Sequence, residues 1–189
     1  MMNICVFCSS SNSVDKKYFQ EAENLGIAIG ESGDNLVYGG TNVGLMNQVA
    51  VSAKQAGGKV IGVLPKLIMD YGISADFLDE LIITPDMAER KKILREKSNA
   101  FIALPGGFGT LEEILEVITL KQLGYHNSPI VFINTNGFYD SLKAQFELSY
   151  VEHFAKKEQN KQYFFADNYK SALSYIKKDK RQDVKPKWD

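Results

Sequence analysis

A glycine-rich turn joins a short apolar run to an amphipathic segment near the middle of the chain. Phe101 to Leu104 has the composition of a buried strand, and apolar residues then recur at helical spacing from Leu111 to Ile118. The turn between them, residues 105–110, reads PGGFGT. Its glycines let a ligand approach the backbone closely, and the free amides and dipole of a helix start favour a phosphate. The sequence therefore predicts a phosphate-binding turn.

Glu113 follows this turn and has two possible roles. With Thr110 it has the Thr-x-x-Glu spacing of a capping box, in which its carboxylate would only hold the first helical turn. Capping would explain these two residues but not the glycines. Gly107 and Gly109 lack the third glycine of a dinucleotide fingerprint, and no acidic residue stands about 20 positions further on to hold a ribose. The pattern therefore favours a mononucleotide.

Two other loops could contribute to the same site. GGTNVG, residues 39–44, follows a short strand, and the spacing of Gly39 and Gly44 resembles the opening of a P-loop. Leu45 and Met46 stand where lysine and serine or threonine would bind phosphate and magnesium, which argues against an NTPase. CSSSNS, residues 8–13, offers hydroxyls to a phosphate or ribose, although serines before a helix often act as caps.

Two cations precede the phosphate-binding turn. Met87, Arg90 and Leu94 fall on one face of a predicted helix, with Lys91 beside them. Isolated cations usually extend into water. Here the next strand leads directly into PGGFGT, and the carboxyl ends of parallel strands share one edge of a sheet. We therefore expect Arg90 to point inward, toward a phosphate or the carboxylate of Glu113.

Strands and helices alternate along the whole chain. We expect strands over 3–7, 36–38, 59–64, 81–84, 101–104 and 129–134, with helices over about 14–32, 45–56, 85–97 and 138–156, then a short strand and a closing helix. The helix from Pro85 should carry Asp86 in its first turn. This alternation predicts a doubly wound, Rossmann-like α/β fold with a mainly parallel sheet. The 189 residues suit one domain, 1–180, followed by a polar tail, 181–189.

Composition excludes several classes of partner. Lys and Arg total 22 against 23 Asp and Glu, so no global field favours nucleic acid or an anionic membrane. The start resembles no signal peptide and no stretch of about 18 residues is apolar throughout, so we expect a cytoplasmic protein. Cys5 and Cys8 should point to opposite faces of a strand as small core and turn residues. With only His126 and His153 available, we expect no metal site.

These motifs together resemble the LOG (Lonely Guy) family of cytokinin riboside 5′-monophosphate phosphoribohydrolases, often mislabelled as lysine decarboxylases. PGGFGTLEE, residues 105–113, matches the family's Pro-Gly-Gly-x-Gly-Thr-x-x-Glu in full, and MAERK, residues 87–91, matches Met-x-x-Arg-Lys. VFCSSS and VYGGTNVGLMN match imperfectly, because Ser9, Thr41 and Asn47 stand where the family commonly has glycine. We expect these three departures to affect which base is accepted.

The resemblance implies hydrolysis of the N-glycosidic bond of a nucleoside 5′-monophosphate, an N6-modified adenine nucleotide or AMP, to a free base and ribose 5-phosphate. That chemistry needs a stabilised oxocarbenium-like sugar and a water at the anomeric carbon. Glu113 would act as the general base or orient the ribose. Arg90 would keep Glu113 ionised or contact the phosphate. It would not act as a general acid, because a guanidinium does not give up its proton. The residues expected to bind substrate are Ser10, Gly39, Gly40, Gly44, Met87, Lys91, Pro105, Gly106, Gly107, Gly109 and Thr110.

The resemblance also implies no metal or other cofactor, and a homodimer or larger homo-oligomer with pockets near the interface. No lysine has the setting of a pyridoxal phosphate Schiff base, which argues against decarboxylation. A nucleotide sensor or carrier without turnover is the alternative, because a phosphate-binding turn would serve either purpose. Glu113 with Arg90 distinguishes the two, since a pure binder has no need of a carboxylate beside the sugar.

Overall fold

The computed structural model describes residues 1–178, and within them seven parallel strands form one sheet in the order β4-β3-β2-β1-β5-β6-β7. The strands are β1 (Asn3–Phe7), β2 (Asn35–Tyr38), β3 (Val60–Pro65), β4 (Glu80–Thr84), β5 (Ala100–Ala103), β6 (Ile130–Ile133) and β7 (Phe164–Ala166). The predicted doubly wound fold with a parallel sheet is confirmed. The single domain over 1–180 stays a prediction, and the predicted tail, 181–189, lies outside the described residues.

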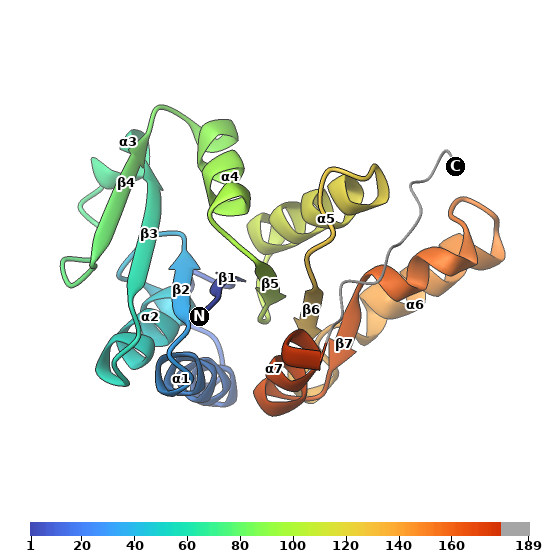
Figure 1. Cartoon of the computed structure of the whole chain (residues 1–189), viewed down its shortest axis with the longest axis horizontal. Helices are drawn as coiled ribbons and strands as arrows, with labels where there is room; N and C mark the ends of the chain where they lie inside the picture. The colour runs from blue at the N-terminus through green and yellow to red at the C-terminus, as the bar shows by residue number, and fades with distance from the viewer. Residues whose placement is uncertain (179–189) are drawn as a thin grey trace.

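Helices cover both faces of the sheet (Figure 1). On one face lie α1 (Lys16–Glu31), α2 (Gly44–Gln55) and α7 (Tyr169–Lys178). On the other lie α4 (Met87–Glu96), α5 (Phe108–Gln122) and α6 (Asp140–Val151). The shorter elements are α3 (Lys66–Met69) and the 3₁₀ segments η1 (Thr135–Gly137) and η2 (Lys157–Gln162). The connection between β3 and β4 therefore contains one short helix.

The central strands are buried on both faces because their alternate side chains enter two separate cores. Ile4 and Val6 of β1 join the core under α1 and α2, whereas Cys5 and Phe7 join the core under α4 and α5. Helices that cover both faces leave no solvated side for polar residues, which explains the nearly continuous apolar runs of these strands.

The order of the strands reverses at β1. From β1 the chain builds the sheet outward through β2, β3 and β4, and then returns to β5 on the other side of β1. The loops that follow β1 and β5 therefore diverge to opposite faces, which opens a crevice at the carboxyl ends of these two strands. The backbone joins the loops there, because Ser9 N donates to Pro105 O at 3.3 Å and Leu45 N donates to Ser9 O at 2.9 Å.

Two helix starts differ from the sequence-based predictions. Asp86 precedes α4 as its N-cap, and its side chain accepts a hydrogen bond from Glu89 N at 2.9 Å, so it does not lie in the first turn. Helix α5 begins at Phe108 after the N-cap residue Gly107, which places Thr110 inside the first turn. Thr110 is therefore not the N-cap residue that the alternative role of Glu113, in a capping box, would require. The reason is that the helix starts earlier, within the glycine turn.

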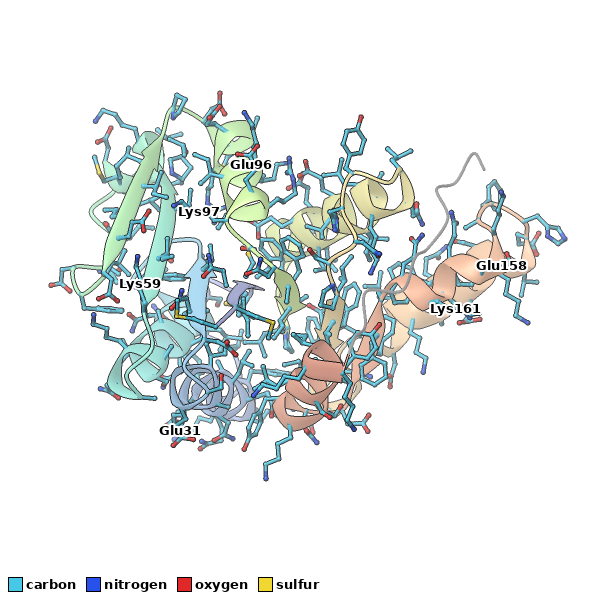
Figure 2. All side chains as sticks on the ribbon, in the orientation of Figure 1. Glu31, Lys59, Glu96, Lys97, Glu158 and Lys161 are labelled. Carbon is cyan, nitrogen blue, oxygen red and sulfur yellow. The ribbon has the colours of Figure 1, made fainter. Side chains whose placement is uncertain are left out.

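Charges of both signs are spread over the surface. The labelled side chains of Glu31, Lys59 and Glu96 lie in different parts of the molecule, and those of Glu158 and Lys161 lie together in η2 (Figure 2). This spread agrees with the near-zero net charge of the sequence. Among residues 1–178, the helices are all too short or too polar to cross a membrane.

Candidate active site

The start of α5 exposes backbone amides to a cleft. Gly107 is the N-cap residue and supplies no capping side chain. A Cβ added at Gly107 or Gly109 would meet nothing within 4 Å, so open space lies beside both glycines. At Gly106, by contrast, a Cβ would collide with the Thr110 hydroxyl. The turn is therefore tight on its inner side and open on its outer side, as a site for an anion at a helix N-terminus requires.

Arg90 and Glu113 form an ion pair across the gap between α4 and α5. Arg90 Nη1 lies 2.5 Å from Glu113 Oε1, and the two side chains are only 8% and 10% exposed. Arg90 Nε donates to the backbone oxygen of Val63 at 3.0 Å, which fixes the guanidinium to the end of β3. Two anchors on one planar group hold its orientation, and the carboxylate that it binds is held with it.

Burial and the arginine act in opposite directions on Glu113. Loss of water around the carboxylate raises the pKa of Glu113, and the Arg90 guanidinium opposes that rise, with a raised pKa as the net result. A carboxylate with a raised pKa is a stronger base than one free in water. The facing Arg90 guanidinium favours the ionised form of the carboxylate, so the pair suits a general base.

A cleft of about 470 Å³ contains this pair and the open side of the turn. Its walls come from the β1–α1 loop and from α2, α4 and α5. Of the predicted site residues, the cleft is lined by Ser10, Met87, Arg90, Gly107, Gly109, Thr110 and Glu113. The other lining residues are Cys8, Ser9, Ser11, Met46 and Phe108. The prediction that Arg90 points toward Glu113 agrees with this arrangement.

This chain is similar to known proteins over most of its length. The family model described as possible lysine decarboxylase matches residues 46–176. The cytokinin riboside 5′-monophosphate phosphoribohydrolase LOG5 of Arabidopsis thaliana is 39% identical over 92% of this chain and 76% of its own length. LOG7 of the same plant, with the same enzyme name, is 38% identical over 98% of this chain and 83% of its own. The chain belongs to the LOG family.

A solved structure extends the comparison beyond the LOG enzymes. The molybdenum cofactor binding protein from the phototrophic bacterium Rippkaea orientalis has a TM-score of 0.72 and 26% identity, covering 93% of this chain and 95% of its own. That protein is named for binding a cofactor and not for hydrolysis. Within this fold, the choice between binding and turnover must therefore be argued from the site.

The glycines of the turn between β2 and α2, residues 39–44, do not line the cleft that contains Arg90 and Glu113. A Cβ at Gly39 would collide with Arg90 Nη2 and with Met46 Cε, so this glycine makes room for the arginine. Gly44 has φ +59°, and a Cβ there would collide with the backbone of Ser10. Gly40, with φ +79°, turns the chain beside β3. Gly39 and Gly44, predicted to bind substrate, instead adjoin residues that face the cleft, whereas Gly40, also predicted to bind substrate, packs against β3.

Pro105 and Gly106 face a different hollow. They line an apolar pocket of about 260 Å³ that shares Ser9 and Gly107 with the cleft. The other residues of this pocket are Val14, Tyr18, Leu45 and Phe138. Pro105 and Gly106 therefore line the side of the glycine turn that faces the apolar pocket, and Gly107 borders both this pocket and the cleft.

Lys91 lies outside the cleft, although the sequence placed it among the substrate-binding residues. Its ammonium contacts the carboxylate of Glu112 and lies 2.9 Å from Glu116 Oε2 on α5. The hydrogen bonds that Lys91 donates to these two carboxylates raise the pKa of Lys91. Arg95 Nη1 joins the same cluster, 2.8 Å from Glu116 Oε1. Lys91 thus ties α4 to α5 one residue away from the Arg90–Glu113 pair.

Cys8 lines the cleft but lacks the environment of a nucleophile. Burial raises the pKa of the Cys8 thiol, and the nearby Glu113 carboxylate raises it further. The thiol therefore stays protonated and unreactive. Cys5 and Cys8 belong to different cores, as the predicted opposite faces require. Among the described residues, no group of three or more His, Cys, Asp or Glu could hold a metal ion.

Sequence reasoning missed three residues of the cleft for different reasons. Met46 stood out only as the wrong residue for a P-loop, and no pattern marks a methionine as part of a wall. The sequence indicates for Cys8 only a small core or turn residue. Phe108 is 93% exposed at the start of α5 and is the variable position of the family motif.

Proposed function

We propose that this LOG family member hydrolyses the N-glycosidic bond of a nucleoside 5′-monophosphate, an N6-modified adenine nucleotide or AMP, to give a free base and ribose 5-phosphate. The observation that carries the proposal is the buried Arg90–Glu113 pair in one cleft with the open start of α5. The cleft offers a phosphate site and a carboxylate at the same time. The names of the LOG relatives from Arabidopsis thaliana support the same reaction.

The phosphate is assigned to the open side of the glycine turn. The first amides of α5 and the Thr110 hydroxyl are donors there, and Ser10 and Ser11 bring further hydroxyls from the β1–α1 loop. The positive end of the helix dipole favours a dianion at this point. Because no lysine lines the cleft, backbone amides and hydroxyls carry most of the binding. A monophosphate suits this site better than a triphosphate, which would crowd the turn.

Glu113 is assigned to the sugar. As the bond between the anomeric carbon and the base breaks, its electron pair leaves with the base and positive charge develops on the sugar. The carboxylate stabilises that charge and accepts a proton from the attacking water, whose oxygen bonds to the anomeric carbon. The proton taken from water ends on the departing base, which balances the reaction. Arg90 holds the carboxylate in place and keeps it ionised until the water arrives.

Hydrolysis is tested by incubating the purified protein with AMP, N6-benzyl-AMP, adenosine and 3′-AMP, followed by chromatography of the released base. We expect faster release of the base from AMP and N6-benzyl-AMP than from adenosine and 3′-AMP. Release of base from none of the four, by protein whose folding is verified by circular dichroism, would contradict the proposal.

A carrier or sensor of a nucleotide without turnover is the second candidate. The similarity to the molybdenum cofactor binding protein of Rippkaea orientalis favours it, because that protein shares the fold. Tight binding of AMP in equilibrium dialysis without release of adenine would support this candidate. The buried carboxylate beside the phosphate site favours hydrolysis, since an anion carrier gains nothing from a second anion in its pocket.

We also propose that the protein forms a homodimer in the cytoplasm. Leu81 and Ile83 on the edge strand β4 are 39% and 41% exposed. An apolar edge of this kind is usually covered in the working protein. Light scattering coupled to gel filtration measures the mass, and a monomer at micromolar concentration would contradict the dimer.

A further inference from the structure

Thr41 is held rigidly in the turn between β2 and α2. Its side chain is 5% exposed, although the residue is polar. The Tyr38 hydroxyl donates to its backbone oxygen at 3.3 Å, and its backbone forms an isolated bridge with Ser74. The backbone of Thr41 is therefore fixed by contacts with Tyr38 and Ser74.

The hydroxyl of Thr41 contacts a residue of the cleft wall. Thr41 Oγ1 donates to Met46 Sδ at 3.3 Å, and Met46 is 9% exposed. A thioether is a weak acceptor, but this bond joins two buried residues. It selects one rotamer of a side chain that otherwise adapts easily to its surroundings.

Met46 in turn lies beside the catalytic pair. A Cβ at Gly39 would collide both with Met46 Cε and with Arg90 Nη2, so the methyl group and the guanidinium share the space over this glycine. Met46 therefore forms the wall of the cleft next to Arg90. The second methionine of the cleft, Met87, is 46% exposed and has room to move.

The remaining part of the cleft must receive the base. The start of α5 takes the phosphate and Glu113 takes the sugar under the proposed function. Met46 and Met87, from α2 and α4, then belong to the apolar part of the cleft wall, with Cys8 and Phe108. A polarizable thioether packs well against the face or edge of an aromatic ring. The geometry thus brings the base against one fixed methionine and one adaptable methionine.

We propose that Thr41 is a positioning residue that sets the base selectivity of this site by fixing Met46. The inference rests on the proposed function. A glycine, which the LOG pattern commonly has at this position, has no hydroxyl and leaves Met46 free to rotate. Thr41 narrows the space for the base, so it disfavours adenines with a bulky N6 group relative to adenine itself.

Three variants separate the hydroxyl from the volume of the side chain. Thr41→Val keeps the volume and loses the hydroxyl, Thr41→Ser keeps the hydroxyl, and Thr119→Val is the matched control. Thr119 is exposed on α5, where its hydroxyl donates to Leu115 O at 2.8 Å. The measured quantity is the ratio of kcat/KM for N6-benzyl-AMP to kcat/KM for AMP, with the thermal midpoint of each variant as the check of folding.

In Thr41→Val the ratio should rise about fivefold, the scale of one lost hydrogen bond, mainly through a lower KM for N6-benzyl-AMP. Thr41→Ser and Thr119→Val should keep the wild-type ratio. A wild-type ratio in folded Thr41→Val would overturn the inference, as would an equal rise in Thr41→Ser. Loss of stability in Thr41→Val with an unchanged ratio would assign Thr41 a purely structural role, which also overturns it.

Failure of the proposed function gives a different result. In that case wild-type protein releases base from neither nucleotide, and the dissociation constants of AMP and N6-benzyl-AMP replace the kinetic constants. The ratio of these two constants should shift in Thr41→Val in the same direction. An unchanged ratio of dissociation constants would overturn the inference for a binding protein as well.

Discussion

The turn between β5 and α5 and the turn between β2 and α2 both follow a buried parallel strand and both are rich in glycine, but the space beside their glycines differs. Gly107 and Gly109 border open space in the cleft. Gly39 and Gly44 border Arg90, Met46 and the backbone of Ser10. The first turn is free to receive a ligand, whereas the second is already filled by residues of the protein. Glycine content alone therefore does not locate a phosphate.

The turn between β2 and α2 affects the reaction through the side chains that pack against its glycines. Gly39 leaves room for Arg90 Nη2, and Arg90 Nη1 then reaches Glu113. Changes in the two turns should consequently affect different steps. A change in the open turn should weaken phosphate binding, and a change in the filled turn should disturb the carboxylate pair.

The largest effect should come from the carboxylate that both turns serve. Glu113→Gln removes the negative charge and keeps the shape, so kcat should fall about 10²–10⁴-fold, as expected for a lost acid–base group. Glu112→Gln is the matched control, because Glu112 is the adjacent acid and pairs with Lys91 outside the cleft. Steady-state rates of base release measure both variants. Equal rates for the two variants would remove Glu113 from the mechanism.

Gly39→Ala should have the next largest effect. The added methyl group collides with Arg90 Nη2 and Met46 Cε, so the variant should lose about 1–3 kcal/mol of stability through overpacking. Displacement of Arg90 by even about 1 Å should lower kcat about 10²-fold. Urea denaturation and steady-state kinetics measure the two quantities. Wild-type kcat in Gly39→Ala would show that the turn does not position the arginine.

Gly107→Ala should affect binding more than stability. A methyl group there meets no atom of the protein, and its replacement at an N-cap should cost about 1 kcal/mol or less. The same methyl group enters the space assigned to phosphate, so KM for AMP should rise about tenfold while KM for adenosine stays near its wild-type value. A parallel rise for both substrates would show that the open turn does not bind the phosphate.

The smallest effect is a pH dependence of the carboxylate pair. The pKa of Glu113 is raised above its ordinary value of 4.5, and a base acts only when deprotonated. Thus kcat/KM should increase with pH through an acidic limb whose midpoint lies above 4.5. Glu112→Gln should keep this limb and Glu113→Gln should lose it. An acidic limb unchanged in Glu113→Gln would assign the titration to another group.

Most of the fold could be predicted from the sequence because burial on two faces leaves a clear signal. Strand β1, predicted over 3–7, spans Asn3–Phe7, since apolar residues fill both sides of it. The start of α5 could not be predicted, because the sequence around Thr110 fits an N-cap residue as well as it fits a residue of the first helical turn. Only the backbone of Gly107 decides between them.

Some residues of the candidate site could be placed from the sequence and others could not. Arg90 and Glu113 could be placed in one cleft because the periodicity of α4 and the motif of α5 both point to the shared edge of the sheet. Lys91 could not be placed, since its partners Glu112 and Glu116 lie on another helix. The role of Gly39 could not be found either, because its neighbours Arg90 and Met46 come from distant parts of the chain.

The initial rate of adenine release from AMP, compared with that from adenosine, tests the central claim most directly. The start of α5 binds a group remote from the bond that breaks, and that binding energy also positions the sugar against Glu113. AMP should therefore show both the lower KM and the higher kcat, and 3′-AMP should resemble adenosine. Equal kcat/KM for AMP and adenosine would contradict the assignment of the cleft to a nucleoside 5′-monophosphate.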